Sequence, residues 1–330
     1  MRPSADPSRP ETGLAYHELH RAGRPGWWRP VLGVVLAAGA SFVVVPLVFQ
    51  VVFAAGLAIA GEPVVDGLEK LLDLDDPTPL GLAYLNLVLA AAIPVTWAVS
   101  RWLHGLRPGW LSSVRPRLDW RFLAACLAVS VASLVLTLLV AMLLPGASAS
   151  AEPATELNAY TRTTRDFLLV VLLLTPLQAA GEEYLFRGYL TQAFGGLFGR
   201  AAAVVVPAVL FALAHGAGQS LPIFVDRLAF GLVAGYLVLR TGGLEAGIAM
   251  HVVNNWLAFG LALAFGEMAS TLNPTGGSWW DLPATLTQTV SYLVLATLVA
   301  DRMGLARRTD PTVLEASGRR VYRVPPARSE

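Results

Sequence analysis

The feature that most constrains this chain is a series of long, almost uninterrupted apolar runs. Most of them approach the ~20 residues that an α-helix needs to cross the hydrocarbon core of a bilayer. The sequence is 55% hydrophobic and only 14% charged, whereas soluble domains carry roughly 25% charged residues. We therefore expect an all-α fold, a polytopic membrane bundle of about eight transmembrane helices. The expected spans are 31–60, 80–100, 122–144, 167–190, 201–219, 222–239, 244–265 and 283–300.

The segments between these runs alternate in charge. Residues 1–30 hold five arginines against three acids, residues 61–79 hold six acids and one lysine, and residues 101–121 hold five arginines and one acid. The tail from Asp301 holds seven arginines. Because arginine and lysine are enriched in cytoplasmic loops, this pattern predicts a multi-pass protein of the cell membrane with both termini in the cytoplasm.

The two ends of the chain differ in composition from its centre. Residues 1–26 and 305–330 are rich in Pro, Ser and Arg, which predicts disordered cytoplasmic segments on either side of a membrane domain at 27–304. No basic stripe with interleaved aromatic residues is present, so we expect the lipid bilayer and no nucleic acid as a partner. The single cysteine, Cys126, excludes an intrachain disulfide.

A few residues that can ionise lie inside the apolar runs, where a charge costs about 2.5–3.5 kcal/mol. Glu183 and Arg187 are four residues apart and can pair on one helix face. Glu182 projects about 100° away and is left free to act as a general base. A structural salt-bridge cluster that ties helices together explains the same residues equally well.

Two further polar groups stand in later runs. His215 follows Phe211 by one helical turn, and Asn255 follows His251 by one turn. A histidine and an amide on one helix face can both donate hydrogen bonds to an oxyanion. The alternatives are a structural histidine at 215 and interhelical hydrogen bonds at 251 and 255.

The depth of these residues in the bilayer provides a first test of convergence. Counted from the expected cytoplasmic helix ends at 1.5 Å per residue, Glu182 lies about 12 Å deep, His251 about 10 Å and His215 about 21 Å. The sequence thus predicts that His215 lies deeper in the bilayer than Glu182 and His251. The neighbouring pair Asp226 and Arg227 is expected to mark the boundary of its helix.

Taken together, the motifs Glu-Glu-x-x-x-Arg, Phe-x-x-x-His and His-x-x-x-Asn follow one another on three expected membrane helices. This combination resembles the CPBP family, which comprises the CAAX prenyl proteases of type II and bacterial proteins of bacteriocin processing or self-immunity. The resemblance covers about residues 165–260, and the remaining spans match only in being membrane helices.

The resemblance implies an intramembrane endopeptidase that acts on a membrane-embedded or lipidated peptide. It implies that Glu182, helped by His215, activates a water molecule. It further implies that His251 and Asn255 stabilise the oxyanion of the tetrahedral intermediate. The residues that it assigns to orienting the site are Glu183 and Arg187.

Two questions stay open at this point. Zinc is possible, since Glu182, His215 and His251 could bind it, but the motif His-Glu-x-x-His is absent and oxyanion donors would leave too few ligands, so no cofactor is favoured. The alternative function is a non-catalytic bacteriocin self-immunity protein or membrane scaffold of the same fold. A transporter with Glu and His as proton relays is a third class, although we find no paired repeat of the kind that such carriers show.

Overall fold

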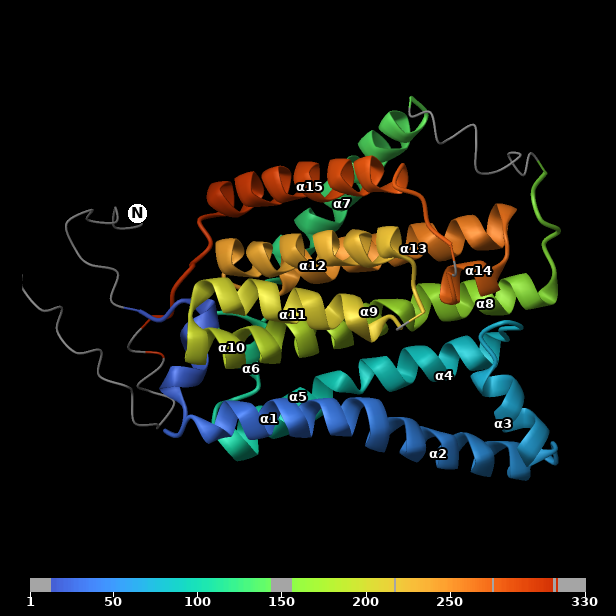
Figure 1. The fold of residues 1–330 in the computed structure, drawn as a ribbon, viewed down its shortest axis with the longest axis horizontal. Helices are drawn as coiled ribbons and strands as arrows, with labels where there is room; N and C mark the ends of the chain where they lie inside the picture. Colours follow the sequence, from blue (N-terminus) through green and yellow to red (C-terminus); the bar gives the residue numbers. More distant parts are fainter. Residues whose placement is uncertain (1–12, 144–155, 217, 275, 311–312, 314–330) are drawn as a thin grey trace, which may run out of the picture.

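The computed structural model describes residues 13–143, 156–216, 218–274, 276–310 and 313, and every extended element in this part of the chain is a helix (Figure 1). The helices are, in chain order, η1 (Tyr16–Ala22), α1 (Trp28–Gly39), η2 (Ala40–Val44), α2 (Val45–Ala60), α3 (Val64–Leu72), α4 (Pro79–Ala90), α5 (Ala92–Val99), η3 (Ser100–His104), α6 (Gly109–Ser112), α7 (Trp120–Ala141), α8 (Arg162–Leu173), α9 (Thr175–Glu183), η5 (Tyr184–Leu190), α10 (Thr191–Phe198), α11 (Arg200–Ala214), α12 (Leu221–Thr241), α13 (Glu245–Phe265), α14 (Met268–Leu272) and α15 (Asp281–Met303).

Seven helical stretches among the described residues are long and apolar enough to cross a membrane. They are Trp28–Ala60, Pro79–His104, Trp120–Ala141, Arg162–Phe198, Leu221–Thr241, Glu245–Phe265 and Asp281–Met303. Their outer surface is apolar: α2 has no buried residue, and its Val51 is 70% exposed. Because a soluble protein rarely exposes so much apolar surface, the prediction of an all-α, multi-pass membrane bundle is confirmed.

The one remaining expected span, 201–219, forms the shorter helix α11 of 15 residues. At 1.5 Å per residue this helix measures about 22 Å, less than the ~30 Å hydrocarbon core. Gly199 alone separates it from α10, with φ of 86°, a conformation that glycine adopts without the steric penalty of a side chain. The chain therefore reverses sharply, and α11 runs back into the bundle and ends at Ala214.

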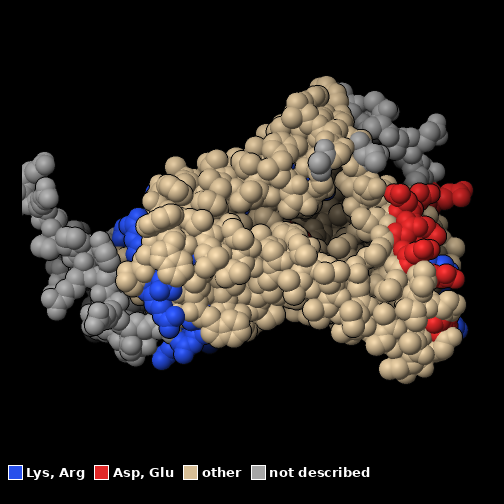
Figure 2. Space-filling model, turned by 60° about the horizontal axis from the view of Figure 1, so that its bottom comes forward, with Lys and Arg blue, Asp and Glu red and all other residues tan. Residues whose placement is uncertain are grey.

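The charged side chains gather at the two ends of the molecule. On the face shown in Figure 2, Lys and Arg lie at one end, Asp and Glu lie mainly at the other, and the surface between them has a hollow. Figure 1 shows α1 beginning and α15 ending at the same end of the bundle, with α3 and α14 at the opposite end. The acids of residues 61–79 accordingly lie in and next to α3, at the opposite end of the bundle from the start of α1 and the end of α15.

The described part of the N-terminal segment is folded, contrary to the expectation for residues 1–26. The Tyr16 hydroxyl of η1 is buried and donates a hydrogen bond to the Leu111 carbonyl at 2.5 Å. Ala15 forms an isolated β-bridge with Arg308, so the segment before α1 meets the segment after α15. The prediction of disorder was wrong for residues 13–26 and 305–310; residues 1–12, 311–312 and 314–330 lie outside the described part.

The bundle packs closely where the central helix α9 meets α4. A Cβ atom at Gly181 would collide with the Leu89 carbonyl oxygen and lie 2.8 Å from the Ala90 Cα. The absence of a side chain thus lets the two helices approach to backbone contact. On the other side, α9 packs against α13, and α13 packs against α7 and α12. This arrangement surrounds the polar residues of α9 with helices.

Candidate active site

The first motif lies in the middle of a long helical stretch that changes its winding. Glu182 and Glu183 end α9, and the π-helix η5 follows directly. Short π segments inside α-helices occur frequently at functional sites. The stretch then continues through α10 to Phe198, eight residues beyond the expected end at 190.

This continuation removes the predicted difference in depth between Glu182 and His215. From Phe198, Glu182 lies roughly 24 Å along the helix at the α-helical rise, and His215 lies roughly 22 Å from the start of α11 at Arg200. The prediction that His215 is deeper than Glu182 was therefore wrong, because the expected helix end was misplaced. Gln192 explains the error: this polar residue is fully buried and donates its amide hydrogen to the Trp110 carbonyl at 2.8 Å.

Glu183 is the buried centre of the site. Its Oε1 atom accepts hydrogen bonds from Nη1 of Arg187 at 3.0 Å and from Nδ1 of His251 at 2.9 Å. The guanidinium of Arg187 also lies 4.1 Å from the centre of the Phe211 ring, a cation–π contact. The predicted pairing of Glu183 with Arg187 is confirmed, and the pair also anchors a histidine from another helix.

Glu182 is held by a different set of contacts. Nε2 of Gln178, one turn earlier on α9, donates to Oε1 of Glu182 at 2.5 Å. The Oε1 atom of the same Gln178 accepts a hydrogen bond from Nδ2 of Asn255 at 2.9 Å. The Gln178 amide therefore links the motif on α9 to the motif on α13. The second carboxylate oxygen of Glu182 lies 3.9 Å from Nε2 of His251.

The hydrogen bonds of His215 and His251 indicate the same tautomer for both rings, with the proton on Nδ1. His215 lies one residue beyond α11, and its Nδ1 is 2.8 Å from the Phe211 carbonyl oxygen. Because a carbonyl oxygen can only accept, Nδ1 of His215 carries the proton. By the same argument Nδ1 of His251 donates to the Glu183 carboxylate. In the neutral ring, each histidine keeps a lone pair on Nε2.

One cavity of about 300 Å³ collects the residues predicted to be catalytic: Glu182, His215, His251 and Asn255 all line it. Glu183 and Arg187 do not line it and lie behind it, almost completely buried. The cavity walls come from α4, α9, α11, α12 and α13, with contributions from α14 and α15. The three motifs thus converge in a polar chamber enclosed by apolar helices.

Further polar residues of this cavity were missed from the sequence. Asp226 and Arg227 lie near the start of α12, as expected, but they also line the cavity, which the sequence did not indicate. Asp226 accepts a hydrogen bond from the Thr285 hydroxyl, whereas the Arg227 guanidinium makes no hydrogen bond or ion pair with a described residue. Gln178 lines the cavity too, and its position one turn before Glu182 was the signal that could have identified it.

The donor set does not fit a metal centre. No group of three or more His, Cys, Asp or Glu side chains in the described ranges is placed to hold a metal ion. Of the proposed zinc ligands, Glu182 and His251 face one another at 3.9 Å, but His215 does not complete a group of three with them. We therefore derive no step through zinc.

The residues of this site lie in a stretch of the chain that matches a known protein family. Residues 164–257 match the family model described as Type II CAAX prenyl endopeptidase Rce1-like. The chain is also 28% identical over 195 residues to the uncharacterized protein YyaK of Bacillus subtilis (strain 168). That match covers 56% of this chain and 63% of YyaK, which is less than two thirds of the relative's length. No solved structure matches the chain significantly.

Proposed function

We propose that this chain, in which residues 164–257 form a domain of the Rce1-like type II CAAX prenyl endopeptidase family, is an intramembrane endopeptidase. The observation that carries the proposal is the convergence of Glu182, His215, His251 and Asn255 on one cavity within a membrane bundle. Ionisable groups are costly inside a bilayer, so a set that shares one polar chamber requires a functional explanation.

In the proposed reaction, Glu182 is the general base. Its free oxygen takes a proton from a water molecule, and the hydroxide attacks the carbonyl carbon of the scissile peptide bond. Gln178 holds the other oxygen of Glu182 and so orients the carboxylate towards the cavity. His215 supports this step through the lone pair of its Nε2, because its Nδ1 is fixed on the Phe211 carbonyl. The proton then passes to the leaving nitrogen as the C–N bond breaks.

Residues of α13 stabilise the oxyanion that forms during the attack. Asn255 gives one amide hydrogen to Gln178 and keeps a second hydrogen for the oxyanion. His251 donates from Nε2 when its ring is doubly protonated, with Glu183 holding Nδ1. Donors fixed in advance in a dry site contribute about 10²–10³-fold each to kcat in other hydrolases.

The surroundings of the cavity support a substrate that reaches the site from the membrane. The chamber lies among helices whose outer surfaces are apolar, which suits a membrane-embedded or lipidated peptide. The concentration of arginine at the end where α1 begins and α15 ends supports an orientation with that end in the cytoplasm. Reporter fusions after residues 72 and 310 test this orientation, with only the second expected to report a cytoplasmic location.

The experiment that tests the activity compares protein termini in three strains. A deletion strain is complemented with the wild type, with Glu182→Gln or with an empty vector, and new N- and C-termini are identified by mass spectrometry. We expect a set of membrane-protein termini that the wild type alone restores. Termini restored equally by Glu182→Gln would contradict proteolysis and favour a non-catalytic immunity or scaffold role.

A further inference from the structure

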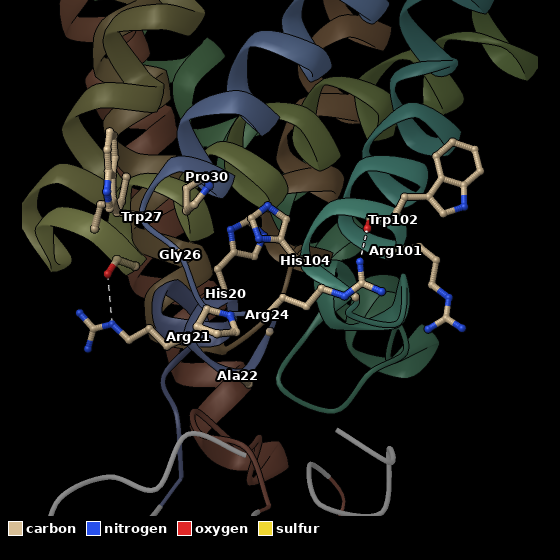
Figure 3. Close-up of a pocket in the computed structure, with 15 residues that line it drawn as sticks. His20, Arg21, Ala22, Arg24, Gly26, Trp27, Pro30, Arg101, Trp102 and His104 are labelled. Carbon is tan, nitrogen blue, oxygen red and sulfur yellow. Dashed lines mark hydrogen bonds between the residues drawn. The ribbon is translucent and has the colours of Figure 1, made fainter. Parts of the chain in front are cut away.

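A second and larger cavity, of about 1270 Å³, lies at the arginine-rich end of the bundle (Figure 3). Its walls are the segment that leads from η1 into α1, the end of η3 and the end of α10. It shares no lining residue with the cavity around Glu182. The catalytic proposal therefore leaves this cavity unexplained.

The charged residues that line this cavity are all basic. Arg21, Arg24 and Arg101 line it, and none of its fifteen lining residues is acidic. Arg21 is neutralised by Glu18 at 3.1 Å. The Arg24 guanidinium makes one hydrogen bond, from Nη1 to the Trp102 carbonyl at 2.9 Å, and the Arg101 guanidinium makes none with a described residue. Both guanidinium groups thus keep donors for an anion.

A buried polar side chain in the wall also lacks a partner. His20 is 5% exposed, and neither of its ring nitrogens has a hydrogen-bond partner among the described residues. Its ring stacks on His104 at 4.0 Å, and Figure 3 shows both rings beside Arg24. Burial and the neighbouring His104 hold the pKa of His20 well below its usual value, so the neutral ring keeps one N–H donor. Both ring nitrogens of His20 are shielded from the cavity, so His20 forms part of the wall through its stacked ring and offers no donor to a ligand.

The position of the cavity distinguishes a lipid from a soluble ligand. Trp27 and Trp102 line its rim with 74% and 75% of their surface exposed, as expected of side chains at the level of lipid headgroups. Beyond Trp27, the large apolar residues Val31 and Leu32 on α1 are exposed towards the hydrocarbon region. A molecule with its anionic head at Arg24 could therefore lay its acyl chains along α1.

We propose that this cavity binds the phosphate headgroup of an anionic phospholipid, with Arg24 and Arg101 as the cationic contacts. Basic pockets between transmembrane helices at the membrane surface recognise such headgroups by this chemistry. The site is separate from the proposed protease centre, so its test does not depend on cleavage.

The test uses the purified, delipidated full-length protein and native mass spectrometry. Wild type, the double variant Arg24→Gln with Arg101→Gln, and the control Arg302→Gln are mixed with phosphatidylglycerol and phosphatidylcholine. Arg302 is an exposed arginine at the end of α15 that does not line the cavity. We expect the wild type and the control to retain phosphatidylglycerol preferentially, and the double variant to retain it at least about tenfold less.

Two outcomes overturn the proposal. The first is equal retention of phosphatidylglycerol by the wild type and the double variant, or an equal loss in Arg302→Gln. The second is binding of sn-glycerol 1-phosphate as tight as that of phosphatidylglycerol, which would identify a soluble phosphate as the ligand. Thermal unfolding of each variant separates loss of binding from loss of fold. The charge-conserving double variant Arg24→Lys with Arg101→Lys is measured in the same way.

Discussion

The carboxylate of Glu183 accepts a hydrogen bond from Nδ1 of His251 at 2.9 Å, and the same oxygen accepts one from Arg187. This contact ties α13 to α9 at a point where all three side chains are almost completely buried. It leaves Nε2 of His251 as the atom that faces Glu182 and the cavity. The two adjacent glutamates therefore have different tasks, one in holding the site and one in the proposed chemistry.

Substitutions of the two glutamates separate these tasks. Glu183→Gln leaves the Arg187 charge buried without its partner, and breaking a buried pair in this way costs about 3–5 kcal/mol. We expect a large drop in melting temperature in detergent, together with loss of cleavage. Glu182→Gln keeps the hydrogen-bonding shape of its side chain and is expected to lose cleavage with little change in melting temperature. Equal stability losses in the two variants would contradict this division.

Gln178 is predicted to act by positioning Glu182 and Asn255. Gln178→Ala removes both hydrogen bonds, and a displacement of about 1 Å in a catalytic group costs about 10²-fold in rate. We expect kcat to fall by about this factor while KM changes little. Gln50→Ala on α2 is the control, because Gln50 is hydrogen-bonded to Tyr84 away from the cavity. A KM effect without a kcat effect would assign Gln178 to substrate binding.

Gly247 on α13 supports the site through its lack of a side chain. A Cβ atom there would lie 2.7 Å from Oε2 of Glu183, which is buried and has no hydrogen-bond partner among the described residues. Gly247→Ala should therefore displace the carboxylate and lower activity at least about tenfold. Gly260→Ala on the same helix meets no atom within 4 Å and should leave activity unchanged. Similar kinetics for both alanine variants would show that Glu183 tolerates displacement.

The reaction is predicted to proceed without a bound metal. The described residues contain no group of three side chains placed to hold one. We expect cleavage by the purified protein to survive exhaustive chelation, with no stoichiometric zinc in elemental analysis. Loss of activity on chelation that is restored by zinc would contradict the glutamate mechanism.

The sequence predicted the membrane class and the polar motifs because both depend on local properties. Long apolar runs are visible directly, and the spacing of Glu183 and Arg187 is set within one helix. The end of the central helix could not be predicted in this way, because Gln192 is polar and finds its partner, the Trp110 carbonyl, far along the chain.

Contacts between distant parts of the chain also account for the other differences between the predicted and the observed structure. Tyr16 lies in a polar segment that looks disordered, but its hydroxyl reaches the Leu111 carbonyl. Asp226 looks like a boundary residue, but its partner Thr285 lies on α15 and both line the cavity. In each case a contact between distant parts of the chain satisfies a polar group, and no local pattern records such contacts. The sequence also predicted which motif residues converge, although it misjudged their relative depth.

The central claim is tested most directly by cleavage in a purified system. Wild type and Glu182→Gln are reconstituted in proteoliposomes with a library of membrane-associated peptides, and new termini are identified by mass spectrometry. The account predicts discrete cleavage products with the wild type and none with Glu182→Gln at equal folded fraction. Cleavage at an unchanged rate by purified Glu182→Gln would contradict it.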